Sequence, residues 1–213
     1  MLVDFETACY ELAADDAVRA FASGAMKSGA ILYEDTPVQE IDVDGDAATI
    51  KAAGQHFAGE TVVVTAGAWA KSRLDDVDID LPVRPTRETV AYWNLGDRPP
   101  ALVEWGDPSV YSLWSPVYGL KAGEHIAGPE TDPDEPGAVN DESVDRLKRW
   151  IATRFPGIDP EPVHAETCLY TNTDDERFIL ERHGRVVVGS PCSGHGFKFA
   201  PVIGKRLAAL ATE

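Results

Sequence analysis

Residues 185–198, with the sequence RVVVGSPCSGHGFK, decide the fold class. Residues 185–188 are rich in valine and predict a buried strand. The glycine-rich stretch 189–196 predicts a turn. Four apolar residues then repeat at helical spacing, namely Val202, Ile203, Leu207 and Leu210. A strand, a turn and a helix in this order are typical of an α/β fold.

The turn in this segment has two interpretations. Gly194 and Gly196 let a ligand approach the backbone closely, and the first amides of a helix that begins there would face a ligand oxygen that becomes negative. The same residues also fit a plain strand-to-helix turn. Neither G-x-G-x-x-G nor G-x-x-x-x-G-K-S/T occurs in the 213 residues, so the sequence contains neither of the two common phosphate-binding loops.

A second apolar run, residues 61–65, predicts a strand buried on both faces. A turn of small residues follows it and again allows close approach to the backbone. That turn consists of Ala66, Gly67, Ala68 and Trp69. Before this strand, residues 38–43 and 47–52 alternate apolar and polar side chains around Gly45, which predicts a hairpin.

The first part of the chain predicts a helix and a short strand. We expect Asp15 or Asp16 to cap the helix and Gly29 to end it. Residues 30–34 predict the short strand.

From about residue 80 the chain predicts strands that are rich in aromatic and β-branched residues and are separated by Pro, Gly and Asp. The predicted strands fall within 81–95, 101–105, 110–113, 168–171 and 178–180. An acidic loop at 130–145 leads into an amphipathic helix that ends at Pro156. The chain is therefore predicted to be α/β, with an α+β part that contains an antiparallel sheet.

The charge balance excludes several partners. The chain has 19 basic and 36 acidic residues, a net charge of −17, so nucleic acid and anionic membranes are not expected to bind it. It has no apolar run of about 18 residues, as a membrane-spanning helix requires. Residues 1–15 lack the basic region of a signal peptide. The three cysteines, Cys9, Cys168 and Cys192, are predicted to be thiols of a reducing compartment. We expect a cytoplasmic protein, and its acidity and few lysines indicate a high-salt cytoplasm.

Cys168 and Lys121 each have a structural and a functional interpretation. A lone cysteine in a strand is usually a small buried apolar residue. The alternative is a nucleophile, although a pairing of Cys168 with His195 has no local support, and no histidine or cysteine spacing predicts a metal site. Lys121 lies four residues before His125 in an aromatic neighbourhood that includes Tyr111. It is either a surface side chain or a fixed cation that stabilises a forming anion.

Five segments, taken in order, carry a resemblance to a known family. They are TAGAW at 65–69, LPVRP at 81–85, GLK at 119–121 with His125, CLYT at 168–171 with DE at 175–176 and FI at 178–179, and SGHGFKF at 193–199. Together they resemble the monomeric sarcosine oxidase and N-methyltryptophan oxidase family of FAD-dependent amine oxidases. The resemblance runs through nearly the whole chain.

The resemblance implies a role for each matched residue. Cys168 would form a thioether to the flavin, and Lys121 would be the site of oxygen activation, with His125 near the flavin edge. Lys198 would hold the substrate carboxylate, and Tyr170 would line the substrate pocket. Tyr111 and Gly194 would also lie at the substrate. The cofactor-binding residues would be Gly67, Ala68, Trp69, Gly194, His195 and Gly196.

The resemblance also implies the reaction. Members of the family oxidise the N-methyl or secondary amine of an amino acid to an imine, with FAD as the electron acceptor. Oxygen is then reduced to hydrogen peroxide, and water hydrolyses the imine. The implied fold is a glutathione-reductase-like FAD domain with an antiparallel-sheet substrate domain. Residues 1–79 and 165–213 would belong to the FAD domain, and 80–164 would form the substrate domain.

The chain departs from the family in one respect, because the N-terminal βαβ unit with its G-x-G-x-x-G motif is absent from these residues. We therefore expect a truncated chain, or half of an oxidase whose dinucleotide-binding unit comes from a separate chain. No activity is expected from the 213 residues alone. The alternative is a non-catalytic binding or interaction protein that holds no flavin.

Overall fold

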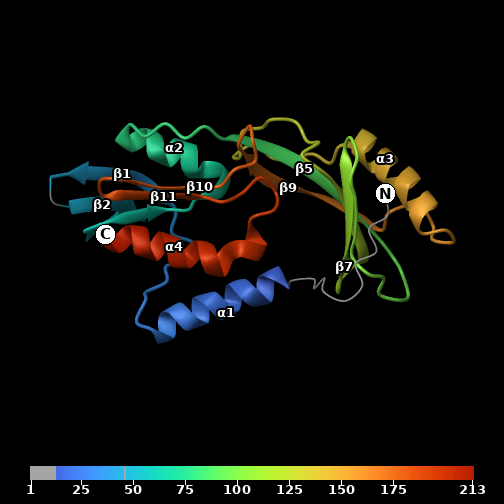
Figure 1. Cartoon of the computed structure of the whole chain (residues 1–213), viewed down its shortest axis with the longest axis horizontal. Helices are drawn as coiled ribbons and strands as arrows, with labels where there is room; N and C mark the ends of the chain where they lie inside the picture. The colour runs from blue at the N-terminus through green and yellow to red at the C-terminus, as the bar shows by residue number, and fades with distance from the viewer. Residues whose placement is uncertain (1–12, 46) are drawn as a thin grey trace. The chain divides into compact units, whose positions relative to one another are not determined.

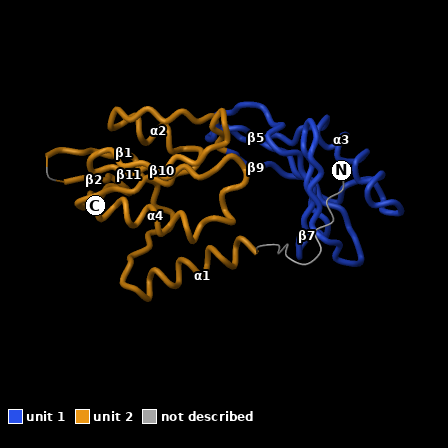
Figure 2. Tube along the Cα trace, viewed as in Figure 1, with its two compact units in different colours: residues 1–11, 85–170 blue, residues 12–84, 171–213 orange. Residues whose placement is uncertain are grey.

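The structure is a computed structural model that describes residues 13–45 and 47–213. Cys9 and Asp46 lie outside the described residues. The described residues form two compact units, one within 13–84 and 171–213 and the other of residues 85–170, as Figure 2 shows. The flavin-binding and substrate-binding roles that the sequence analysis gave to 1–79, 80–164 and 165–213 stay predictions.

The unit within residues 13–84 and 171–213 contains a sheet of three strands in the order β10-β11-β4. The strands are β4 (Val62–Val64), β10 (Ile179–His183) and β11 (Val186–Ser190). β4 runs parallel to β11, whereas β10 is antiparallel to it. The helix α4 (Ala200–Thr212) packs on one face of this sheet (Figure 1). Its residues Ile203 and Leu207 contact Val187 there.

The other face of this sheet lies against a core formed with a second sheet. That sheet has the order β1-β2-β3 and consists of β1 (Val38–Asp44), β2 (Ala47–Ala52) and β3 (Gln55–Gly59). Ile41 of β1 and Leu74 of the short helix α2 (Ala70–Leu74) are almost fully buried with Val64 and Val188. The predicted hairpin is confirmed, since β1 and β2 pair antiparallel on both sides of Gly45.

Three sequence-based expectations in this unit are wrong. The first helix, α1 (Ala14–Lys27), begins after Ala13, so Asp15 and Asp16 lie inside its first turn, where they face the helix dipole but do not cap it. Residues 30–34, predicted to be a short strand, form none. Val63 is 42% exposed, because its side chain points to the α4 side of the sheet and not into the core that contains Val62 and Val64.

The unit that contains residues 85–170 is built on a five-stranded sheet of order β6-β7-β8-β5-β9. The strands are β5 (Arg84–Trp93), β6 (Leu102–Glu104), β7 (Ser109–Ser115), β8 (Gly119–His125) and β9 (His164–Asn172). β5, β7 and β8 pair antiparallel, and so do β6 and β7. The antiparallel sheet expected from the sequence is thus present.

One face of this sheet is covered by α3 (Asp141–Arg154), whose Leu147 and Ile151 are fully buried against Trp93 and Leu120. The helix begins earlier than predicted, because the Asn140 side chain accepts a hydrogen bond of 3.1 Å from the Ser143 backbone amide. The last residues of the predicted acidic loop are therefore helical. Among the described residues, no helix is both long and apolar enough to cross a membrane.

Candidate active site

The face of the five-stranded sheet that does not contact α3 carries five of the residues singled out from the sequence, namely Tyr111, Lys121, His125, Cys168 and Tyr170. Residues directly opposite on paired strands point to the same face, and the register pairs Tyr92 with Lys121 and Tyr111 with Gly123. We call this face the site face. Its residues are Glu88, Tyr92, Tyr111, Lys121, Gly123, His125, Glu166, Cys168 and Tyr170.

Two tyrosines on the site face are hydrogen-bonded to each other through their hydroxyl groups, Tyr111 on β7 and Tyr170 on β9. Burial raises the pKa of Tyr111 to about 12, and burial together with Tyr111 raises the pKa of Tyr170 above its ordinary value. Both phenols therefore stay protonated and can donate hydrogen bonds. The Tyr170 ring centre also lies 5.8 Å from the imidazole centre of His125.

Cys168 is a free, half-buried thiol two residues before Tyr170 on β9. Burial raises its pKa, the positive charge of Lys121 opposes this effect, and the carboxylates of Glu88 and Glu166 add to it. The thiol therefore lies within the electrostatic influence of one cation and two anions. Both interpretations of Cys168, as a small buried residue and as an attachment point, fit this position.

Glu88 was not predicted from the sequence, although it is almost fully buried on the site face. Its Oε2 accepts hydrogen bonds from the Ala127 amide at 3.0 Å and the Gly128 amide at 2.7 Å, and its Oε1 accepts one from Thr86 Oγ1 at 2.5 Å. Glu88 thus holds the turn that directly follows His125. Its position two and four residues before Val90 and Tyr92 on β5 puts all three side chains on one face of the sheet.

The predicted cofactor-binding turns lie in the other unit, at the carboxyl ends of two neighbouring parallel strands. Gly67–Trp69 forms a short 3₁₀ helix after β4, and the turn with Gly194 and Gly196 follows β11. The register places Val62 beside Val186 and Val64 beside Val188. The carboxyl ends of parallel strands are where α/β sheets usually bind ligands.

The closing turn differs from the prediction. Gly194 and Gly196 do not begin the last helix, because a 3₁₀ helix, η3 (Phe197–Phe199), lies between the turn and α4. Glycine is nevertheless required at 196, since a Cβ there would lie 1.5 Å from the Pro191 carbonyl oxygen. The buried Ser193 fixes the turn through its amide, which donates to the Thr171 carbonyl at 2.9 Å.

His195 and Lys198 are on the same segment. His195 Nδ1 lies 2.8 Å from the Ser193 carbonyl oxygen, and its ring packs 5.2 Å from that of Phe178. Lys198 belongs to η3 rather than to the first turn of α4, and it is exposed, with its ammonium 5.5 Å from the centre of the Phe199 ring.

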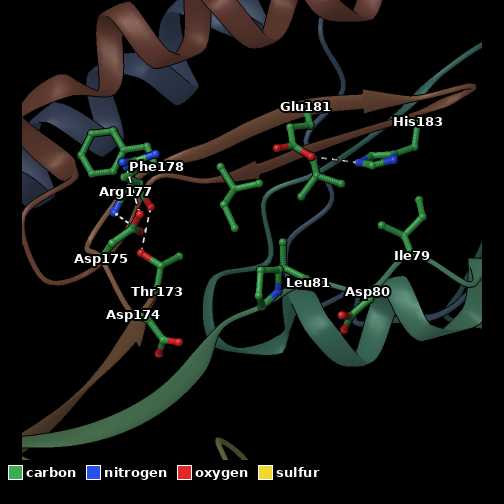
Figure 3. Close-up of a pocket in the computed structure, with 13 residues that line it drawn as sticks. Ile79, Asp80, Leu81, Thr173, Asp174, Asp175, Arg177, Phe178, Glu181 and His183 are labelled. Carbon is green, nitrogen blue, oxygen red and sulfur yellow. Dashed lines mark hydrogen bonds and ion pairs between the residues drawn. The ribbon is translucent and has the colours of Figure 1, made fainter.

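A cavity of about 420 Å³ in the same unit contains none of the predicted site residues. Buried Leu81 and Val188 form part of its wall, and Figure 3 shows Glu181 beside His183 toward one end and Asp175 beside Arg177 toward the other. Its lining residues are Ile79, Asp80, Leu81, Pro82, Thr173, Asp174, Asp175, Arg177, Phe178, Ile179, Glu181, His183 and Val188.

Comparison with known proteins decides the family, because the family described as FAD dependent oxidoreductase matches residues 5–210. The chain belongs to the FAD-dependent oxidoreductase family. It is 32% identical over 226 residues to a monomeric sarcosine oxidase of Bacillus sp. (strain NS-129), an alignment that covers 98% of this chain and 58% of that protein. It is 37% identical over 223 residues to a probable sarcosine oxidase of Arabidopsis thaliana, covering 92% and 53% of the two chains.

Solved structures agree with this FAD-dependent oxidoreductase fold. NikD, an amino acid oxidase of nikkomycin biosynthesis, superposes with a TM-score of 0.80 at 25% identity over 93% of this chain and 56% of that chain. The L-proline dehydrogenase of P. horikoshii gives 0.82 at 21% identity, over 93% and 55%, and supports the fold alone. The chain spans about half the length of the relatives it matches.

The comparisons confirm the family and the fold class that the resemblance implied. The individual site residues, the covalent attachment through Cys168, the high-salt cytoplasmic location and a separate partner chain stay predictions.

Proposed function

We propose that this chain functions in the FAD-dependent oxidation of the secondary (N-methyl) amine of an amino acid such as sarcosine. The amine loses two electrons and two protons to become an imine, O2 gains them to become H2O2, and water hydrolyses the imine. The observation that carries this proposal is the site face, where a thiol, an ammonium group and a pair of protonated tyrosines come together from three strands.

The described residues fit the ring end of FAD. A half-buried free thiol, Cys168, can form the proposed thioether, and the aromatic side chains beside it offer a surface for a flat apolar ring. When bound, FAD would take two electrons from the amine and pass them to O2. The turns at Gly67–Trp69 and at Gly194 and Gly196 would hold the cofactor through backbone approach.

The side chains of this chain would bind the substrate and stabilise charge. One phenol of the Tyr111–Tyr170 pair donates its hydrogen to the other, so the pair would donate a single hydrogen bond at the substrate, and Lys198 would hold the substrate carboxylate by a charge-assisted hydrogen bond. Lys121 would keep a positive charge beside O2 as O2 gains electrons and becomes negative. This charge would lower the energy barrier for reoxidation of the flavin. His125 would lie near the flavin edge.

The test is amine oxidation by flavin-loaded protein. The 213-residue chain is produced together with a second chain that carries a βαβ unit with the G-x-G-x-x-G motif, in the presence of FAD. We expect anaerobic bleaching of the flavin by sarcosine or another N-methyl amino acid, and H2O2 release in air. Flavin-loaded protein that no N-methyl amino acid reduces would contradict the proposed function.

One observation favours a second candidate, a binding protein that holds no flavin. The sequence contains no glycine motif for a dinucleotide pyrophosphate. Protein from the same preparation that is colourless, and stays colourless after addition of FAD, would support this candidate. A yellow colour that survives acid precipitation would exclude it.

A further inference from the structure

The ammonium group of Lys121 is held by a ring and not by a carboxylate. Its Nζ lies 5.7 Å from the centre of the Tyr92 ring, within the range of a cation–π interaction. Its neighbour on the other side, across β7, is the apolar Leu113. Within the part of the chain that the structure describes, no carboxylate forms an ion pair with Lys121.

The Tyr92 ring itself is fixed by contacts on several sides. It is 5% exposed, and its hydroxyl donates a hydrogen bond to Glu166 Oε1 on β9. The ring centres of Tyr118 and His164 lie 5.2 and 5.6 Å away, and those two rings stack on each other at 4.5 Å. Burial, and then the hydrogen bond to Glu166, raise the pKa of Tyr92, so its hydroxyl remains a donor.

The way in which Lys121 is held matters for its proposed task. An ion pair would fix the ammonium but would also cancel much of the field that it exerts on a neighbouring anion. The face of an aromatic ring attracts a cation through its quadrupole and carries no net charge. Glu166 accepts a hydrogen bond from the Tyr92 hydroxyl, whereas the Lys121 ammonium contacts the Tyr92 ring, so the carboxylate and the ammonium interact with different parts of the phenol.

We propose that Tyr92 is the positioning residue of Lys121, holding the ammonium on the site face without neutralising it. This inference rests on the proposed function for its catalytic meaning. The contact between the Lys121 ammonium and the Tyr92 ring can be tested on the 213-residue chain without flavin.

The first experiment observes Lys121 by NMR. The lysines are converted to ¹³C-dimethyl-lysine, which remains cationic, and the Lys121 signal is assigned by its loss in K121R. We expect an upfield ring-current shift relative to an exposed lysine such as Lys205, and a nuclear Overhauser effect between the Lys121 methyl groups and the Tyr92 ring protons. The shift should persist in Y92F, which keeps the ring, and disappear in Y92L.

A Lys121 signal that coincides with that of Lys205 in the wild type, or that does not change in folded Y92L, would overturn the proposal. If Y92L does not fold, the Overhauser effect in the wild-type chain still decides the matter, because its absence contradicts the contact.

The second experiment measures the two half-reactions in the flavin-loaded protein. Y92L should slow reoxidation of the flavin by oxygen about 2- to 30-fold, which is the effect expected from the loss of one cation–π interaction. K121M removes the cation itself and should slow reoxidation by about two to three powers of ten. Anaerobic reduction by the substrate should change little, and Y92F should lose less than Y92L. Equal losses in both half-reactions would contradict the positioning role.

If no N-methyl amino acid reduces the wild-type protein, the proposed function and the catalytic role of Tyr92 both fail, whereas the NMR result on the contact stands by itself.

Discussion

The phenol of Tyr111 lies directly over Gly123 on the neighbouring strand. A Cβ at position 123 would lie 2.8 Å from Tyr111 Oη and 3.0 Å from Val90 Cγ1. Glycine at this position therefore lets Tyr111 reach across β8 toward Tyr170.

Gly123→Ala should disturb this arrangement, because the added methyl group must displace Tyr111 or Val90. We expect a loss of about 1–3 kcal/mol in the free energy of unfolding, measured by urea denaturation. The matched control is Gly204→Ala in α4, where a Cβ meets nothing within 4 Å and alanine favours the helix, so that variant should be neutral or more stable. If Gly123→Ala is as stable as the wild type, Tyr111 does not lie over Gly123.

Glu88 is expected to hold the turn after His125 through hydrogen bonds and not through its charge. Glu88→Gln keeps an oxygen that can accept from the amides of Ala127 and Gly128, whereas Glu88→Ala leaves both amides without this acceptor. Amide hydrogen exchange at 127 and 128 should be close to wild type in Glu88→Gln and much faster in Glu88→Ala, with about 1–3 kcal/mol lost per unpaired buried group. Equally slow exchange in both variants would show that other contacts hold the turn.

The acid sensitivity of the unit that contains residues 85–170 should depend on Glu104. Hydrogen bonds from Arg154, and then from Trp150, lower the pKa of Glu104 from 4.5 to about 2. A lowered pKa in the folded state means that this carboxylate stabilises the protein above pH 4.5 and that its contribution is lost as the pH falls toward 2.

Glu104→Gln should therefore be less stable than the wild type near neutral pH, and the difference should shrink between about pH 4.5 and 2. Urea midpoints across this pH range measure the effect, with Glu60→Gln as the control at an exposed glutamate. A difference that is the same at pH 2 and pH 7 would rule out this assignment.

Some parts of the fold could be predicted from the sequence and others could not. Alternation along residues 38–52 was enough to predict the hairpin, and the aromatic and β-branched residues of 81–95 were enough to predict β5. The sequence did not reveal that Val63 is exposed, since a run of valines is the same whether one or both faces are covered.

The candidate site was predictable only in part, for a similar reason. Lys121, His125, Cys168 and Tyr170 lie in segments that resemble known motifs, and the alternation of β8 and β9 brings them to one face. Tyr92 and Glu88 were missed, because their roles depend on the register between β5 and β8 and on the turn at 127–128, neither of which is encoded locally. The start of α4 was misplaced, because the glycines suit a turn and a helix start equally.

Lys198 is predicted to bind the substrate carboxylate. Lys198→Ala should lower kcat/KM for an N-methyl amino acid by about 30- to 1,000-fold, which corresponds to about 2–4 kcal/mol for a carboxylate that loses a charged partner. An N-methyl amine without the carboxylate should be oxidised almost equally by wild type and variant. If both substrates lose the same factor, Lys198 does not recognise the carboxylate.

The most direct test of the central claim, that the site face is where this chain meets the flavin, is peptide mass spectrometry of the flavin-loaded protein after acid precipitation. We predict a flavin mass on the peptide that contains Cys168 and none on the peptide that contains Cys192, a half-buried thiol of the other unit. Cys168→Ala should release all of its flavin into the acid supernatant. Complete release of flavin from the wild-type protein, or retention of bound flavin by Cys168→Ala, would contradict the account.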